Sequence, residues 1–409
     1  MKRLVICCDG TWNKPENDNV TNIEKIARTV QTDLGRTGGV QQLVQYVGGV
    51  GANWYWMDRV LGGAFGFGLF EHVTRAYRFL ALNYEPGDEI FVFGFSRGAY
   101  TARSLVGMMT RVGLITRQAL VAEKLPEAVN RYRGRPARGR AFGSSNEEFR
   151  HDSCHPDLRV DFLGVFDTVG ALGVPGASGS GHTFHDVRLS PEVIVARQAL
   201  AIDARRIKFE PCLWEVEQTA DSPGRVKQVW FEGAHSDVGG GYASTGLSDT
   251  ALLWMLQEAN MQGLVFDTDT DLLATYIQSN SPAERHSSLT LGYRLLNLVE
   301  WVKNQMTGNT HFRGSWRRLD GAEARDVRIA SSAQRHWDAR EGYDSPSIGW
   351  FKAANGDVWS ERSVLPVIAL PEPPGTLDQL LEEEHVDLAA ANPPRVTLPT
   401  QGVEHTPGG

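Results

Sequence analysis

Short apolar runs, each followed by a polar or glycine-rich turn, constrain the fold of this chain more than any other feature. Nearly continuous apolar character is typical of parallel strands that are covered on both faces. The runs are Leu4–Cys8, Glu89–Phe95, Val160–Phe166 and Gln228–Phe231. Helix-compatible stretches separate them, at 22–34, 68–82, 97–112 and 191–204. This alternation predicts an α/β fold with a mostly parallel sheet, right-handed crossovers and helices on both faces. In such sheets functional groups gather beyond the carboxyl ends of the strands, where all four polar turns are expected to lie.

The length of 409 residues fits one large domain with additions. We expect an α/β domain over residues 1–350. It contains an insertion at 116–158, where five arginines within 131–140 indicate a surface loop, and a helical cap or extension at 250–350. A C-terminal extension follows at 351–409. Its proline- and acid-rich part, 371–409, is expected to be loosely structured or disordered.

Bulk composition excludes several classes of protein. The net charge of −8 argues against a nucleic-acid binder, which would carry a basic surplus. The N-terminal apolar run is too short for a signal peptide, and no run of about 18 apolar residues offers a spanning helix. We therefore expect a chain made in the cytoplasm, which a dedicated secretion system can export without such a signal. The four cysteines include the adjacent Cys7 and Cys8, a poor arrangement for a disulfide or a zinc site, so reduced thiols are expected. Nothing indicates the oligomeric state.

The sequence GFSRG, from Gly94 to Gly98, fits the G-x-S-x-G pattern of a nucleophile elbow. The pattern places Ser96 on a strained turn, and the flanking glycines let the following helix pass close to the strand. An apolar run precedes the pattern and a helix-compatible run follows it. This context favours a nucleophilic serine over a structural one.

A serine nucleophile needs a general base, and the base needs an orienting acid. Asp167 follows the next expected strand and His235 follows the one after that. The order Ser96, Asp167, His235 is the order found in α/β-hydrolases. Asp237 is a rival, because it can orient His235, cap the following turn or join a metal site. The glycines 239–241 beside His235 are expected to leave room for substrate.

The loop DGTWN, Asp9 to Asn13, also follows a strand. Aspartate-dependent phosphatases contain DGT but need an aspartate at the position of Cys7, so that activity is excluded. In a serine hydrolase this loop can supply a backbone N–H to the oxyanion hole. We assign Gly10 and Thr11 to this role together with Arg97, the residue after the serine. Asp9 is expected to hold the loop by hydrogen bonds.

Two other functions stay open at this point. Asp9, Asp167, His235 and Asp237 carry oxygen and nitrogen ligands suited to a metal-dependent hydrolase. A hydrolase fold can also serve as an inactive module that binds a lipid or a protein. The glycine- and aromatic-rich segment 46–73 can form a lid whose apolar surface makes transient contact with a membrane.

Five motifs together resemble a known family. DGTWN, GGAFGFGL, NYEPGDEIFVFGFSRGAYTARSL, GVFDTVGALG and FEGAHSDVGGGY occur in the order of the α/β-hydrolase domain family related to the catalytic domain of type VI secretion phospholipase effectors. The resemblance covers roughly residues 1–350 and is far more specific than the elbow alone. It implies a serine hydrolase acting on ester bonds of lipids, with Ser96, Asp167 and His235 at the matching positions. No cofactor is expected.

Overall fold

The computed structural model describes residues 1–10, 19–49, 65–134, 145–169, 189–205, 211–214, 224–267, 285–286, 312–313, 316–317, 319, 327–339, 345–355 and 367–368. The chain forms two compact units, residues 1–370 and 371–409. The second unit lies outside the described residues, as do the tail expected to be disordered and most of the aromatic segment proposed as a lid. Everything below concerns the first unit.

The first unit is built on an eight-stranded sheet whose neighbouring strands are all parallel, in the order β10-β9-β6-β5-β4-β3-β1-β2. The strands are β1 (Lys2–Cys8), β2 (Gln41–Val47), β3 (Glu89–Phe95), β4 (Val160–Phe166), β5 (Val193–Ala201), β6 (Val226–Phe231), β9 (Val327–Ala330) and β10 (Val367–Ile368). A separate antiparallel pair consists of β7 (Phe312–Arg313) and β8 (Trp316–Arg317). The predicted α/β fold with a mostly parallel sheet is confirmed.

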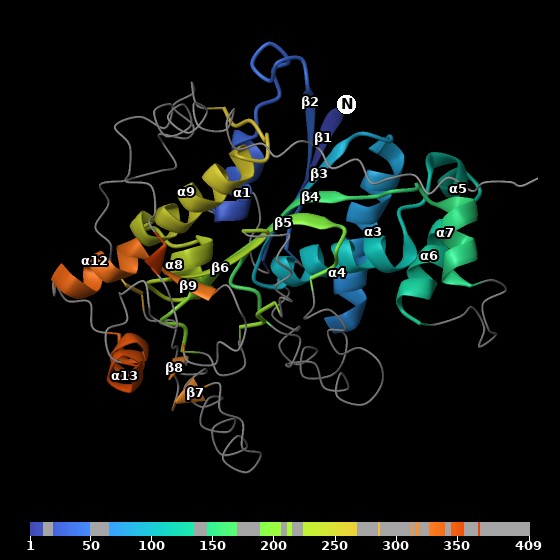
Figure 1. Ribbon diagram of the computed structural model, residues 1–409. Coiled ribbons are helices and arrows are strands. Elements are labelled where there is room, and N and C mark those ends of the chain that lie inside the picture. Colours follow the sequence, from blue (N-terminus) through green and yellow to red (C-terminus); the bar gives the residue numbers. More distant parts are fainter. Residues whose placement is uncertain are drawn as a thin grey trace, which may run out of the picture. The chain divides into compact units, whose positions relative to one another are not determined.

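Helices cover both faces of this sheet (Figure 1). On one face α3 (Phe65–Asn83) and α4 (Arg97–Val112) pack on each other and on β1, and α4 also packs on β3 and β4. On the other face α1 (Asn22–Thr29) packs on β1 while α9 (Gly246–Asn260) packs on β4 and β5. Further helices in the part that the structure describes are α8 (His235–Gly239), α12 (Ser331–Ala339) and α13 (Pro346–Asn355). Both faces of the central strands are therefore buried, which explains their apolar sequences.

Within the segment 191–204, residues Val193–Ala201 form the strand β5, so the predicted helix there is wrong. Val193, Ile194 and Val195 open β5, and such β-branched residues favour extended backbone. The strand lies between β4 and β6, and all its residues except Ile194 are buried. The crossover before β5 places it in the middle of the sheet, where tertiary pairing decides the conformation. The region 250–350, expected to be helical, also supplies β9, which pairs with β6.

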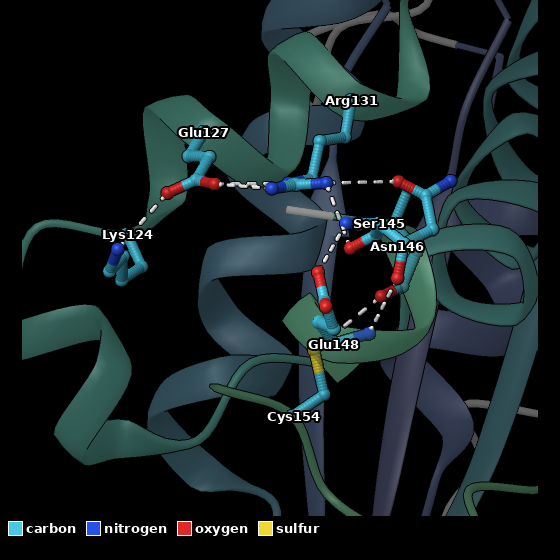
Figure 2. Close-up of polar contacts among 8 residues, drawn as sticks. Lys124, Glu127, Arg131, Ser145, Asn146, Glu148 and Cys154 are labelled. Atoms are coloured by element: carbon cyan, nitrogen blue, oxygen red, sulfur yellow. Dashed lines mark hydrogen bonds and ion pairs between the residues drawn. The ribbon is translucent and has the colours of Figure 1, made fainter. Parts of the chain in front are cut away.

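The insertion between β3 and β4 contains α5 (Arg117–Val121), α6 (Leu125–Tyr132) and α7 (Asn146–Ser153). Figure 2 shows how polar contacts join α6 to α7. The guanidinium of Arg131 pairs with Glu127 at 2.7 Å, lies over the ring of Phe149, and donates to the carbonyl of Ser145 at 3.2 Å. Ser145 caps α7 in a capping box with Glu148. Arg131 is thus buried, contrary to the expected surface loop; residues 135–144 lie outside the described part.

All four cysteines are free thiols. Cys7 and Cys8 are buried in β1, and burial raises the pKa of Cys8 to about 12. Within the part of the chain that the structure describes, every helix is too short or too polar to cross a bilayer.

Candidate active site

Ser96 occupies a sharp turn between β3 and α4. Its φ of 57° and ψ of −118° are unusual for a non-glycine residue, and it stands at the N-cap of α4. A Cβ at Gly94 would lie 2.6 Å from the backbone of α4, and one at Gly98 would lie 2.1 Å from the carbonyl oxygen of Cys8. The glycines therefore let α4 pass close to both β3 and β1, as the elbow pattern predicts.

Asp167 follows β4 in the neighbouring position of the sheet. Its φ of 38° is also positive, so both side chains sit on backbone held in a sparsely populated region. The backbone is fixed on two sides, because Ser96 N donates to the carbonyl of Phe166 and Asp167 N donates to the carbonyl of Ala199. The carboxylate is fully buried, and its Oδ1 accepts the N–H of Ala201 at 3.0 Å.

His235 begins α8, after a short turn that follows β6, and its imidazole lies between the other two side chains. Nδ1 lies 2.6 Å from Oδ2 of Asp167, and Nε2 lies 2.8 Å from Oγ of Ser96. An ionised carboxylate only accepts hydrogen bonds, so Nδ1 donates to Asp167 and Nε2 accepts from Ser96. The ring of Phe95 packs against the imidazole, with centroids 4.7 Å apart. The structure thus brings Ser96, His235 and Asp167 into one chain of hydrogen bonds.

Arg317 of β8 completes the surroundings of Asp167. Its Nη1 lies 2.6 Å from Oδ1 and its Nη2 lies 3.1 Å from Oδ2. Burial alone would raise the pKa of Asp167, but the guanidinium and the hydrogen bond from His235 outweigh it and lower the pKa to about 2. Sequence reasoning missed this residue. It lies 150 positions from Asp167 in a two-residue strand, and no local pattern distinguishes it from the other arginines.

Asp237, the rival acid, has other partners. Its Oδ2 accepts the N–H of Ala234 at 2.8 Å, and its Oδ1 lies 2.6 Å from Nδ1 of His286. Burial raises the pKa of Asp237 despite these hydrogen bonds. The ring of Tyr242 stacks on His286, with centroids 4.1 Å apart. Asp237 therefore holds the turn of α8 and a second imidazole, while Asp167 contacts His235.

The loop after β1 lies beside the elbow, because Gly98 packs against the carbonyls of Cys8 and Asp9. Asp9 is buried, and Thr21 Oγ1 and Tyr46 OH donate to its Oδ2 at 2.6 and 2.7 Å. The N–H of Gly10 is directed at Asp9 Oδ1, 2.6 Å away. Thr11 lies outside the described residues. Arg97 is the first residue of α4, where backbone N–H groups have no partner within the helix.

The glycines after His235 approach protein groups rather than open space. A Cβ at Gly239 would lie 2.0 Å from the ring of Phe95, and one at Gly240 would lie 2.7 Å from the backbone of Asn22. Both positions are filled by neighbouring elements, since α8 packs tightly between the elbow and α1. The expectation that all three glycines leave room for substrate is therefore wrong for these two.

The four residues considered for a metal site do not gather. Asp9 and Asp237 contact the partners described above, and Asp167 is shared between His235 and Arg317. Across the described ranges, no cluster of three or more histidine, cysteine or acidic side chains has the geometry to hold a metal ion.

Residues from the C-terminal part of the chain support the turn that precedes His235. Glu232 is buried and accepts hydrogen bonds from Ser332 Oγ at 2.8 Å and His336 Nδ1 at 2.9 Å. Asp203 accepts from the backbone of Gly233 at 2.9 Å and from Ser345 Oγ at 2.6 Å. The α12 contacts therefore reach Glu232 directly, and Ser345, the residue before α13, reaches Gly233 through Asp203.

Comparison with known proteins gives this arrangement a family. The family described as "T6SS, Phospholipase effector Tle1-like, catalytic domain" matches residues 2–258. The chain belongs to this family. The matched part of the Tle1-like domain includes Ser96, Asp167 and His235, whereas Arg317 lies beyond it.

Other similarities to this Tle1-like chain are more distant. The "Uncharacterized protein YEL023C" of Saccharomyces cerevisiae (strain ATCC 204508 / S288c) is 29% identical over 226 residues, which cover 51% of this chain and 32% of the relative. The chain thus matches about a third of the length of that relative. A structure of the Tle1 effector bound to the VgrG spike from the type 6 secretion system is 17% identical, with a TM-score of 0.40, over 76% of this chain and 81% of that chain. A crystal structure of an uncharacterized protein from Pseudomonas aeruginosa is 16% identical, with a TM-score of 0.37, over 83% of this chain and 57% of that chain.

Proposed function

We propose that this chain is a serine hydrolase that cleaves carboxylic ester bonds of lipids through Ser96, His235 and Asp167. The observation that carries the proposal is the continuous hydrogen bonding from Ser96 Oγ through the imidazole to a buried carboxylate. Its location supports the same conclusion, because the serine stands on a strained turn at the carboxyl edge of a parallel sheet.

The first half of the reaction transfers the acyl group to the enzyme. Nε2 of His235 takes the proton of Ser96 while Oγ attacks the ester carbonyl carbon. The tetrahedral intermediate collapses, its bond to the alcohol oxygen breaks, and His235 returns the proton to the departing alcohol. Asp167 keeps Nδ1 protonated and stabilises the imidazolium that forms transiently.

The second half releases the acid. His235 takes a proton from a water molecule, whose oxygen attacks the acyl carbon of the ester formed with Ser96. Collapse of the second intermediate breaks the bond to Oγ, and His235 returns the proton to the serine. Atoms balance as one water consumed for one ester cleaved.

Backbone amides are the proposed oxyanion donors. The N–H of Arg97 opens α4, whose N-terminal dipole favours negative charge nearby. The loop of Gly10 and Thr11 is the second proposed donor, because its base is packed against the elbow. The N–H of Gly10 would have to leave Asp9 Oδ1 to serve, which makes Thr11 the better candidate of the two.

Membership of the Tle1-like family supports a lipid ester as the substrate, and we propose phospholipids as the substrate class. The same membership supports export by a type VI secretion system as the route by which the chain meets that substrate. No observation favours the metal-dependent hydrolase or the inactive binding module over this proposal.

The decisive experiment compares wild type with Ser96→Ala. The variant is expected to keep the circular dichroism spectrum and melting temperature of the wild type while its turnover of p-nitrophenyl esters falls about 10⁴-fold or more. A fluorophosphonate probe should label wild type at Ser96, as located by mass spectrometry, and a chelator should leave turnover unchanged.

A screen across acyl esters, lysophospholipids and phospholipids then defines the substrate. Turnover by Ser96→Ala at the wild-type rate, or labelling at a different residue, would overturn the assignment of the nucleophile. A nucleophile at Ser96 with no turnover of any lipid would keep the chemistry and overturn the substrate class.

A further inference from the structure

Arg317 and His235 both contact the carboxylate of Asp167. The side chains of Arg317 and Asp167 are fully buried, and the guanidinium contacts both carboxylate oxygens at 2.6 and 3.1 Å. Nη1 also donates to the carbonyl of Ala201 at 2.8 Å, which ties the guanidinium to the end of β5. The planar fork of arginine therefore has a fixed position relative to the sheet.

These contacts leave the Asp167 carboxylate little freedom to rotate. Oδ1 accepts from Ala201 N and from Nη1 of Arg317, and Oδ2 accepts from His235 Nδ1 and from Nη2. Four donors from three separate elements thus fix the plane of the carboxyl group. Without the guanidinium, one backbone N–H and the histidine would remain, and the group could turn about its χ2 torsion.

We propose that Arg317 is a positioning residue of this hydrolase, which acts through Asp167 to hold His235 in line with Ser96. This inference rests on the proposed function. It also adds to the proposed site a residue of the β7–β8 pair, which lies beyond residues 2–258, the part of the chain that matches the family. The contacts that place Arg317 beside the proposed catalytic groups are those with the Asp167 carboxylate, so we expect its effect to reach the chemistry through that carboxylate.

Charge supplies a second effect with a definite sign. Asp167 and His235 are in direct hydrogen-bond contact, and turnover needs the two groups without an additional proton. A neighbouring cation disfavours uptake of that proton. Removal of Arg317 should therefore move the acid limb of the pH profile to higher pH, by about 1 unit or more.

The test uses the full chain with Arg317→Met and Arg317→Lys. Arg197→Met is the matched control, because Arg197 of β5 is equally buried and pairs with Glu258 of α9, away from the carboxyl edge. Three quantities are measured: kcat and KM for an ester, the rate of fluorophosphonate labelling at Ser96 as a function of pH, and the NMR titration of histidine-labelled protein.

We expect Arg317→Met to lower kcat about 100-fold with little change in KM, since misplacement by about 1 Å costs that much and no substrate contact is lost. Its labelling rate should show the raised acid limb. Arg317→Lys should keep the acid limb near that of wild type, because the charge remains, and should recover part of kcat. Arg197→Met should lower thermal stability and leave both the acid limb and kcat in place.

If Arg317→Met folds and keeps both the kcat and the acid limb of wild type, the inference is overturned. Labelling at Ser96 would still support the proposed function in that case. If Arg317→Met does not fold, Arg317→Lys decides: wild-type kcat in that variant overturns the inference, and a fall of about 10-fold with an unchanged acid limb supports it. Failure of the proposed function looks different, because wild type itself would then show neither turnover nor labelling at Ser96. An acid limb shifted equally in Arg197→Met would also overturn the inference.

Discussion

Two aspartates at opposite ends of β4, one partly and one fully buried, have pKa values shifted in opposite directions. Asp161, near the start of the strand, accepts the N–H of Ile90 at 2.7 Å, and burial raises its pKa to about 6. Asp167, just past the end, is more deeply buried, yet Arg317 and His235 outweigh that burial and its pKa is about 2. Burial by itself favours the neutral acid, so an ionised carboxylate in the core requires a cation built beside it. Among the described residues, Arg317 provides such a cation in ion-pair contact at the carboxyl end of the strand.

Replacing each aspartate by asparagine tests directly whether the two ends of β4 differ in function. Asp167→Asn should lower kcat about 10⁴-fold, because the amide no longer holds His235 in the required tautomer. Asp161→Asn should change kcat less than about 2-fold, because Asp161 lies at the other edge of the sheet from Ser96 and its main partner is the backbone of Ile90. Steady-state kinetics on one ester checks both. Equal losses in the two variants would show that the two ends of β4 do not differ in function.

The same two variants also test the difference between Asp161 and Asp167 through the free energy of unfolding as a function of pH. Asp167 has a pKa lowered from 3.8, so its contribution is present above that value and is lost as pH falls towards about 2. Asp161 has a pKa raised from 3.8, so its contribution is present below that value and is lost as pH rises through about 6. At pH 7, Asp161→Asn should therefore be more stable than wild type by about 1–2 kcal/mol. Asp167→Asn should be less stable by about 3–5 kcal/mol, because Arg317 keeps a buried charge without its partner.

Urea unfolding from about pH 3 to 8 measures these differences. The gain in Asp161→Asn should disappear as pH falls to about 4, where the wild-type carboxyl is protonated as well. A gain that is the same at every pH would show that the charge of Asp161 is not its cause.

The smallest expected effect concerns the support of the His235 turn. Ser345→Ala removes one hydrogen bond to Asp203, which still accepts from Gly233. We expect a loss of about 1 kcal/mol in stability and a fall in kcat of only a few-fold. Thermal melting and kinetics on the same preparation check this. A 100-fold loss of kcat would show instead that Ser345, like Arg317, positions the proposed catalytic groups. The support for these groups would then extend to the residue before α13.

The sequence was sufficient to bring Ser96, Asp167 and His235 together as candidates because each lies within four residues after the end of an apolar strand. The carboxyl ends of parallel strands meet at one edge, so position along the chain translates into position in space. The oxyanion donors Gly10, Thr11 and Arg97 stay predictions, since they depend on backbone N–H directions that no side chain encodes.

The sequence was insufficient where a long-range partner decides. Residues 191–204 were predicted as a helix, but pairing with β4 and β6 makes Val193–Ala201 a strand. Periodicity alone does not distinguish a short, mostly apolar buried strand from a buried helix. Arg317 escaped notice because its partner is 150 residues away. The prediction that the glycines after His235 leave room for substrate failed at Gly239 and Gly240 for a related reason. A glycine indicates that another group approaches the backbone closely, but the sequence does not show which group it is.

The pairing of β9 with β6 has a consequence for the newly synthesised protein. β6 ends at Phe231 and β9 begins at Val327, so at about 5–20 residues per second the ribosome needs roughly 5–20 s to make the chain between them. During that interval the serine and histidine already exist, but β6 is an open edge and the arginine that pairs with Asp167 is missing or newly emerged. Until Arg317 and β9 have been synthesised, a nascent chain has neither the ion pair between Asp167 and Arg317 nor the strand β9 that pairs with β6.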